Sequence, residues 1–220
     1  MRRVSAKFVP RVLTVEPKQQ RLSISLELLD HAASDFSFLG NVITGVETWV
    51  YGYDPETRVQ SSQSKSPSSP PAKKARSNIK VMMIVFFDLH GIVRAEFVAR
   101  NTMVNSEYYK GLLEHLRNDV RRKRPEKWAN GFIRHHDNAR CHTSLLVWQF
   151  LSKILVCPHP LYSPYLAPCD FWLFLKIKMT MKGKHFESIQ DIEAATTAQL
   201  RDTHGRGLPV LLQKVARMTG

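Results

Sequence analysis

Acidic residues are scarce in this chain of 220 residues: 19 Asp and Glu stand against 32 Lys and Arg, which leaves a net charge of +13. Such an excess is unusual for a metabolic enzyme and common in proteins that contact phosphate backbones. The three cysteines allow no even-numbered disulfide framework, which indicates a reducing compartment. No apolar run approaches the length of a membrane span, and the basic start is not followed by the apolar core of a signal peptide. We therefore expect an intracellular protein that binds nucleic acid, with no membrane partner and no small-molecule substrate.

The hydrophobic residues, 43% of the chain, are enough for a buried core, and their periodicity predicts its elements. Leu22, Leu26 and Leu29 repeat at helical spacing, which predicts an amphipathic helix with Ile24 and Leu28 on the same stripe. The later segments predict strands at 43–53, 79–89, 92–98, 131–136 and 154–156, and helices from 105 to 125, around 144–153, from 168 and from 188. The core order βββαβαβα is that of an α/β, RNase-H-like fold, a mixed sheet with flanking helices.

The composition along the chain divides it into three parts. Residues 1–40 predict a basic arm followed by one helix, and residues 41–204 predict the α/β domain. Within that domain, residues 54–78 are rich in Ser, Pro and Lys and predict an exposed loop. Residues 205–220 predict a weakly anchored C-terminal tail.

Two carboxylates carry the clearest chemical signal. Asp137 follows the apolar strand 131–136, and Asp170 lies in the first turn of a helix opened by Pro168. Two rigid elements that each present an aspartate can converge on hard cations, which prefer carboxylate oxygens. Phosphodiester cleavage by two metal ions needs such carboxylates, so Asp137 and Asp170 are candidate catalytic and metal-binding residues. The competing interpretation is that both are structural caps.

The residues around these aspartates resemble the signature of mariner-type transposases of the DDE/D superfamily. The resemblance extends over nearly the whole chain, from the family's linker at 4–10, through segments at 104–109 and 122–125, to 182–186. It rests above all on His136-Asp137-Asn138-Ala139 with His142-Thr143, and on Ser163-Pro164 with Leu166-Ala167-Pro168-Cys169-Asp170. It implies cutting and joining of DNA at transposon ends, with Mg²⁺ or Mn²⁺ held by three aspartates, a homodimer and a nuclear location. Carried over by position, Asp137 is the second metal ligand and Asp170 the third.

The first metal ligand of the family has no counterpart here. The family's segment Thr-Gly-Asp-Glu-Thr-Trp is matched by residues 44–49, with Val46 at the place of the aspartate. Adjacent residues of a strand point to opposite faces, so Glu47 should point away from that place unless the strand bulges. We therefore expect a catalytically impaired enzyme with weakened metal binding. Tyr165 also stands where the family usually has an aspartate. We interpret this difference, and the departure from the family at Leu161, as sequence drift.

The resemblance begins at the family's linker, which predicts an N-terminally truncated protein without the helix-turn-helix modules that read transposon ends. A non-catalytic DNA-binding or dimerisation module derived from a transposase is therefore the alternative to an impaired enzyme.

Basic residues gather in two places that we consider candidate DNA contacts. One is the end of the helix predicted from 105, and the other lies in the exposed loop, where a nuclear localisation signal or a contact to a partner subunit is the alternative. The first group also has an alternative interpretation, as a solvated face that complements the helix dipole. The candidates are Arg117, Arg121, Arg122, Lys123, Arg124 and Lys127 in the first group and Lys73, Lys74 and Arg76 in the second.

Several histidines and cysteines close to Asp137 raise the question of a zinc site. No Cys-x-x-Cys pair is present, so the spacing argues against structural zinc. We interpret His136, Asn138 and His142 instead as supporting residues that orient Asp137 and the turn after it.

Overall fold

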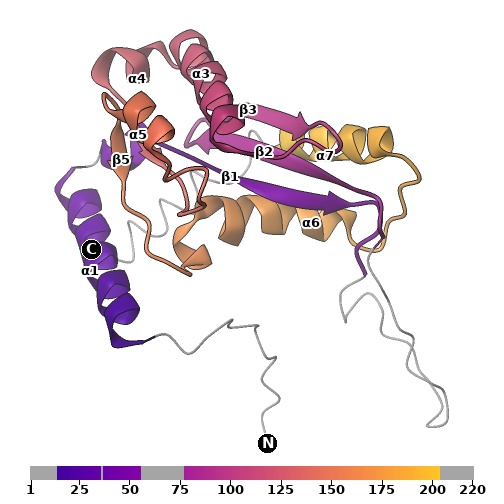
Figure 1. Ribbon diagram of the computed structural model, residues 1–220, viewed down its shortest axis with the longest axis horizontal. Helices are drawn as coiled ribbons and strands as arrows, with labels where there is room; N and C mark the ends of the chain where they lie inside the picture. Colours follow the sequence, from indigo (N-terminus) through magenta and orange to yellow (C-terminus); the bar gives the residue numbers. More distant parts are fainter. Residues whose placement is uncertain (1–13, 36, 56–76, 204–220) are drawn as a thin grey trace, which may run out of the picture.

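A five-stranded mixed sheet forms the centre of the domain in the computed structural model, which describes residues 14–35, 37–55 and 77–203 (Figure 1). The strand order is β3-β2-β1-β4-β5. β1 pairs antiparallel with β2 and parallel with β4, β2 pairs antiparallel with β3, and β4 pairs parallel with β5. The strands are β1 (Val42–Tyr51), β2 (Lys80–Asp88), β3 (Gly91–Val98), β4 (Ile133–His135) and β5 (Leu155–Cys157). This arrangement confirms the α/β, RNase-H-like fold predicted from the order of elements.

Helices cover both faces of the sheet. α3 (Ser106–Lys123) and α5 (Leu145–Leu151) cover one face, and α6 (Phe174–Met181) and α7 (Ile189–Thr203) cover the other (Figure 1). Asn105 begins α3 as predicted, because its side chain accepts a hydrogen bond from the backbone N–H of Tyr108 at 2.9 Å. The remaining elements are α1 (Val15–Ser34), α2 (Phe38–Asn41), α4 (Pro125–Asn130), η1 (Pro164–Leu166) and η2 (Cys169–Leu173).

Alternation along the strands divides the core into two layers. Val46 and Val50 of β1 pack toward η2, α6 and α7, whereas Ile43 packs toward α3 and α5. Leu112 and Leu116 of α3 are each 2% exposed, and the burial of one such side chain stabilises a fold by about 1.5–3 kcal/mol. No helix among the described residues is long and apolar enough to cross a membrane.

Two details differ from the sequence prediction. The predicted apolar stripe of α1 was only partly right: its leucines Leu22, Leu26 and Leu29 are 47–61% exposed, whereas Ile24, predicted on the same stripe, is buried. Pro125 not only ends the predicted helix but also begins α4, since proline is tolerated in a first helical turn. The predicted arm at 1–13, most of the predicted loop (56–76) and the tail from 204 lie outside the described residues.

Candidate active site

Asp137 and Asp170 come from β4 and η2, which both contact β1. Asp137 follows β4 by two residues, and Asp170 lies in the first turn of η2. Burial and then the negative charge of Asp137 raise the pKa of Asp170, with Lys178 acting in the opposite sense. The two carboxylates are therefore close enough to repel each other, a repulsion that a bound cation would relieve.

His142 fixes the position of Asp137. Its Nδ1 atom forms an ion pair with Oδ1 of Asp137 at 2.6 Å, and the backbone N–H of Ala139 donates a hydrogen bond to the same oxygen at 3.1 Å. Burial by itself raises the pKa of Asp137, but the hydrogen bond from His142 and its charge lower the pKa by more. Asp137 is therefore ionised and held in place in the chain without metal.

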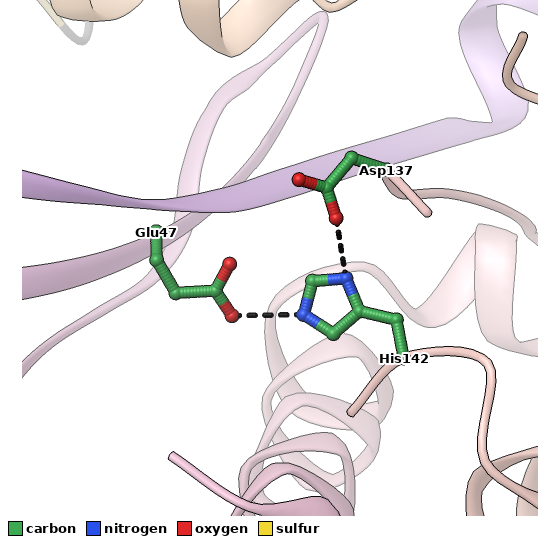
Figure 2. A group of neighbouring side chains, drawn as sticks. All are labelled: Glu47, Asp137 and His142. Atoms are coloured by element: carbon green, nitrogen blue, oxygen red, sulfur yellow. Dashed lines mark hydrogen bonds and ion pairs between the residues drawn. The ribbon is translucent and has the colours of Figure 1, made fainter. Parts of the chain in front are cut away.

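Glu47 binds the other nitrogen of the same imidazole. Oε1 of Glu47 lies 2.9 Å from Nε2 of His142, so one ring joins two carboxylates (Figure 2). The His142 side chain is fully buried and packs against Tyr109, with the ring centroids 3.9 Å apart. Burial alone would lower the pKa of His142, but the contacts with Asp137, Cys141 and Glu47 outweigh it and raise the pKa to about 12. His142 is therefore a cation between two anions.

Val46 occupies the position where the resemblance places an aspartate. It is 8% exposed and belongs to the apolar cluster that contains Cys169 and Leu173, on either side of Asp170 in the chain. Glu47 leaves β1 on the opposite face, as the alternation of a strand requires. The face of β1 next to η2 therefore offers no carboxylate at this position.

A buried arginine, Arg134, forms hydrogen bonds with β1 next to the site. The Arg134 guanidinium is 0% exposed and donates hydrogen bonds to the carbonyls of Ile43 at 3.1 Å and Gly45 at 3.2 Å, and to the Tyr109 hydroxyl at 2.9 Å. A Cβ atom on Gly45 would lie 2.4 Å from the Phe86 ring and 2.7 Å from the carbonyl of Val85, so only glycine fits there. Arg134 thus satisfies carbonyl groups of β1 where pairing with β4 ends.

The other histidines near Asp137 form their hydrogen bonds with backbone or neutral groups. Nδ1 of His136 donates to the carbonyl of Asp137 at 2.9 Å, and the Asn138 amide donates to the carbonyl of His159 at 2.6 Å. His135 lies 2.9 Å from the Thr44 hydroxyl. Burial lowers the pKa of both His135 and His136 to about 3, so both are neutral near pH 7.

A groove runs along the unpaired edge of β1 beyond Thr44, the last residue of β1 that pairs with β4. Its volume is about 280 Å³, and its lining includes Glu47, Tyr51, Asp54 and Lys178. The groove therefore lies between β1 and α6, and Glu47, which contacts His142, lines it.

The basic residues of α3 and α4 fall into two groups. Arg124 and Lys127 turn inward: Arg124 Nε lies 2.8 Å and Lys127 Nζ 2.7 Å from the buried Asp88 carboxylate. Burial raises the pKa of Asp88, but the hydrogen bonds from these two cations lower it by more. The outward group contains Arg117, Arg121, Arg122 and Lys123, all exposed, although Arg122 also contacts Asp119 at 2.9 Å and Lys123 donates to the carbonyl of Val93 at 2.6 Å. Lys73, Lys74 and Arg76 lie outside the described residues.

The side chains present fit a divalent cation only in part. Ligand atoms of Glu47, Asp137 and His142 lie within 4.8 Å of one another, which is close enough for a common ion. However, His142 carries protons on both nitrogens while it contacts two carboxylates, and a protonated imidazole has no lone pair for a metal. Asp137 and Asp170 fit the oxygen preference of Mg²⁺ or Mn²⁺ and repel each other without it. The site therefore offers two carboxylates and lacks a third at Val46.

Comparison with known proteins assigns this geometry to a family. Residues 54–130 match the family model "Transposase (partial DDE domain)". The Mos1 mariner transposase of Drosophila mauritiana is 31% identical over 191 residues, which is 85% of this chain and 55% of Mos1. The Mos1 mariner paired-end complex with Mn superposes with a TM-score of 0.81 at 28% identity, over 92% of this chain and 60% of that one. The chain has a mariner-type DDE transposase catalytic domain.

Two further matches agree with this mariner-type assignment. Human histone-lysine N-methyltransferase SETMAR is 28% identical over 217 residues, which is 94% of this chain and 31% of SETMAR. The crystal structure of the Mos1 catalytic domain has the same fold, with a TM-score of 0.75 at 24% identity over 96% of this chain and 93% of that one. The chain thus spans little more than half of Mos1 and under a third of SETMAR.

Sequence reasoning missed Tyr109 and Arg134 of this mariner-type site, and it considered Glu47 only as a replacement for the first aspartate. Glu47 and Tyr109 both contact His142, and no spacing along the chain indicates these contacts. A signal for Arg134 was present, because a charged residue in the middle of an apolar strand needs buried partners.

Proposed function

We propose that this domain belongs to the class that cuts and joins DNA at transposon ends, with Asp137 and Asp170 as its cation ligands. Its activity is reduced because Val46 offers no third carboxylate. The observation that carries the proposal is that β4 and η2, the elements that present Asp137 and Asp170, both contact β1, and that His142 holds the Asp137 carboxylate at 2.6 Å. Mos1, which is similar over most of this chain, has been crystallised with Mn, with Mg and with a left transposon end.

Bound Mg²⁺ or Mn²⁺ would stabilise the attacking and leaving oxygens of a phosphodiester. Neighbouring side chains fix the position of the ligand Asp137 and of the strand β1 next to it. His142 orients Asp137 at 2.6 Å, Glu47 holds His142 from the other side at 2.9 Å, and Arg134 supports β1 beneath them. With Val46 in the apolar cluster, less negative charge faces the cations, so binding should be weaker than at a site with three carboxylates.

A second candidate function is a non-catalytic DNA-binding or dimerisation module. The burial of Val46 in the apolar cluster that also contains Cys169 favours it, because the position is part of the core. In either case we propose duplex DNA as the partner, with exposed Arg121 and Arg122 in contact with its phosphate backbone. We also propose a homodimer like that suggested by the paired-end complexes of Mos1, and a nuclear location.

A Mn²⁺ titration followed by electron paramagnetic resonance tests the proposed ligands. We expect weak binding by the wild-type chain, and a loss of at least about tenfold in affinity in Asp137→Asn and in Asp170→Asn, since each removes an anionic oxygen ligand. Asp30→Asn, which removes an exposed carboxylate from α1, is the charge-matched control and should bind as the wild type does. Equal affinities in all four proteins would refute the site.

A further inference from the structure

Arg21 of α1 spans a turn that lies 140 residues further along the chain. Its guanidinium donates hydrogen bonds to the Tyr165 hydroxyl, to the carbonyl of Tyr162 at 3.0 Å and to the carbonyl of Leu161 at 3.5 Å. The guanidinium carbon also lies 5.2 Å from the centre of the Tyr165 ring, within the range of a cation–π contact. One side chain thus contacts both ends of the turn formed by residues 161–165.

This turn needs external contacts to keep its shape. Tyr162 has φ +55°, in the left-handed region that is unfavourable for a residue with a side chain. Between β5 and η2, the described chain has only η1 as regular structure. The contacts from Arg21 therefore act on a segment that has little support from secondary structure of its own.

The turn leads directly to Asp170 through a series of backbone hydrogen bonds. The N–H of Leu166 donates to the carbonyl of Ser163 at 3.0 Å, and that of Ala167 donates to the carbonyl of Pro164 at 3.2 Å. The N–H of Asp170 in turn donates to the carbonyl of Ala167 at 2.9 Å. A displacement of the turn would therefore move the start of η2 and the carboxylate that it carries.

α1 is itself attached to the domain next to this turn. Ile24, one turn beyond Arg21, is 9% exposed, and the charge of Glu27 acts on Cys157 at the end of β5. In Figure 1, α1 stands at the side of the domain nearest β5. α1 therefore lies against the domain beside this turn and beside the end of β5.

We propose that Arg21 is a positioning residue for Asp170: it fixes the turn 161–165 through Tyr165 and Tyr162 and so sets where the Asp170 carboxylate lies relative to Asp137. The inference rests on the proposed function in one respect, that Asp170 holds a cation. It gives Tyr165 a role as the partner of Arg21, where the sequence alone suggested drift.

Hydrogen exchange and Mn²⁺ affinity of the full chain, measured side by side, test this. In Arg21→Gln we expect faster exchange in residues 161–170, unchanged exchange in β1 and β2, and Mn²⁺ affinity about tenfold lower, as for loss of a group that orients a metal ligand. Loss of a positive charge alone would strengthen Mn²⁺ binding. Weaker Mn²⁺ binding in Arg21→Gln would therefore come from displacement of Asp170 and not from the change in charge. Lys18→Gln removes an exposed cation from the same helix and should change neither quantity.

Tyr165→Phe is the graded variant, because it keeps the ring and loses only the hydroxyl that accepts from Arg21. We expect an intermediate effect on exchange and affinity, and no further effect of Tyr165→Phe in the Arg21→Gln background. Exchange and affinity in Arg21→Gln equal to those in Lys18→Gln would overturn the inference, and so would faster exchange throughout the sheet. If the wild-type chain binds no Mn²⁺, the proposed function fails, and hydrogen exchange alone tests the role of Arg21. Faster exchange in Arg21→Gln that is confined to residues 161–170 would support Arg21 as the residue that holds the turn. Unchanged exchange in these residues would refute that role.

Discussion

His142 and Asp137 form a 2.6 Å ion pair in which the histidine side chain is fully buried and the aspartate side chain is 37% exposed. In His142→Asn the carboxylates of Asp137 and Glu47 lose their shared cation. We expect the free energy of unfolding to fall by about 1–3 kcal/mol, less than for a fully buried pair because Asp137 keeps contact with water. Urea unfolding at neutral pH measures this. A loss as large in His90→Asn, at a side chain that is 66% exposed, would mean that the effect is not specific to the ion pair.

The free energy of unfolding should be largest near neutral pH. His135 and His136 have folded-state pKa values of about 3, so below pH 6.5 the unfolded chain takes up protons that the folded chain does not. Stability should then fall by up to ~1.4 kcal/mol per pH unit for each of the two. His142, with its raised pKa, acts in the opposite sense: its contribution is complete below 6.5 and is lost as pH rises toward about 12. Urea unfolding between pH 4.5 and 9 checks this, and His135→Gln should reduce the acid-side slope by about half.

The elements of the fold were predictable because each has its own periodicity, but the contacts between them were not. Alternation in β1 correctly sends Glu47 to the face opposite Val46. The alternation cannot show that Glu47 contacts His142, 95 residues later in the chain, and through it Asp137. For α1, helical spacing identified the helix and placed Ile24 on its apolar stripe, but it did not show that Ile24 is buried while Leu22, Leu26 and Leu29 are exposed.

The basic end of α3 shows the same limit of sequence reasoning. The excess of positive charge is visible in the sequence, but the division between Lys127, which pairs with Asp88, and Arg121, which is exposed, depends on the fold. A run of basic residues therefore predicts the sign of a surface and not which of its members reach the surface.

Lys127 should act on stability. Its side chain is 6% exposed and its Nζ lies 2.7 Å from the fully buried Asp88 carboxylate, so Lys127→Ala leaves this carboxylate with Arg124 as its remaining cationic partner. We expect a loss of about 1–3 kcal/mol in the free energy of unfolding, measured by urea denaturation. Lys110→Ala breaks an equally short pair with Glu114 on the surface and should cost under about 1 kcal/mol. Equal losses in the two variants would contradict the assignment of Lys127 to the interior.

Arg121 and Arg122 should act on DNA binding. We expect weak binding to duplex DNA of any sequence, with affinity that falls steeply as salt rises, because phosphate contacts release counterions. Arg121→Gln combined with Arg122→Gln should reduce the slope of log affinity against log salt by about 1–2, measured by fluorescence anisotropy. An unchanged slope would show that this end of α3 is only a solvated face.

The most direct test of the account is nicking of supercoiled plasmid in Mn²⁺ by the wild-type chain, by Val46→Asp and by Val46→Asp combined with Asp137→Ala. The account predicts little or no nicking by the wild type, metal-dependent nicking by Val46→Asp, and none by the double variant. Val46→Asp places a carboxylate in the apolar cluster that contains Cys169, so it should also unfold more easily without metal and gain more stability from Mn²⁺ than the wild type does. Nicking by the wild type that persists undiminished in Asp137→Ala would contradict the account.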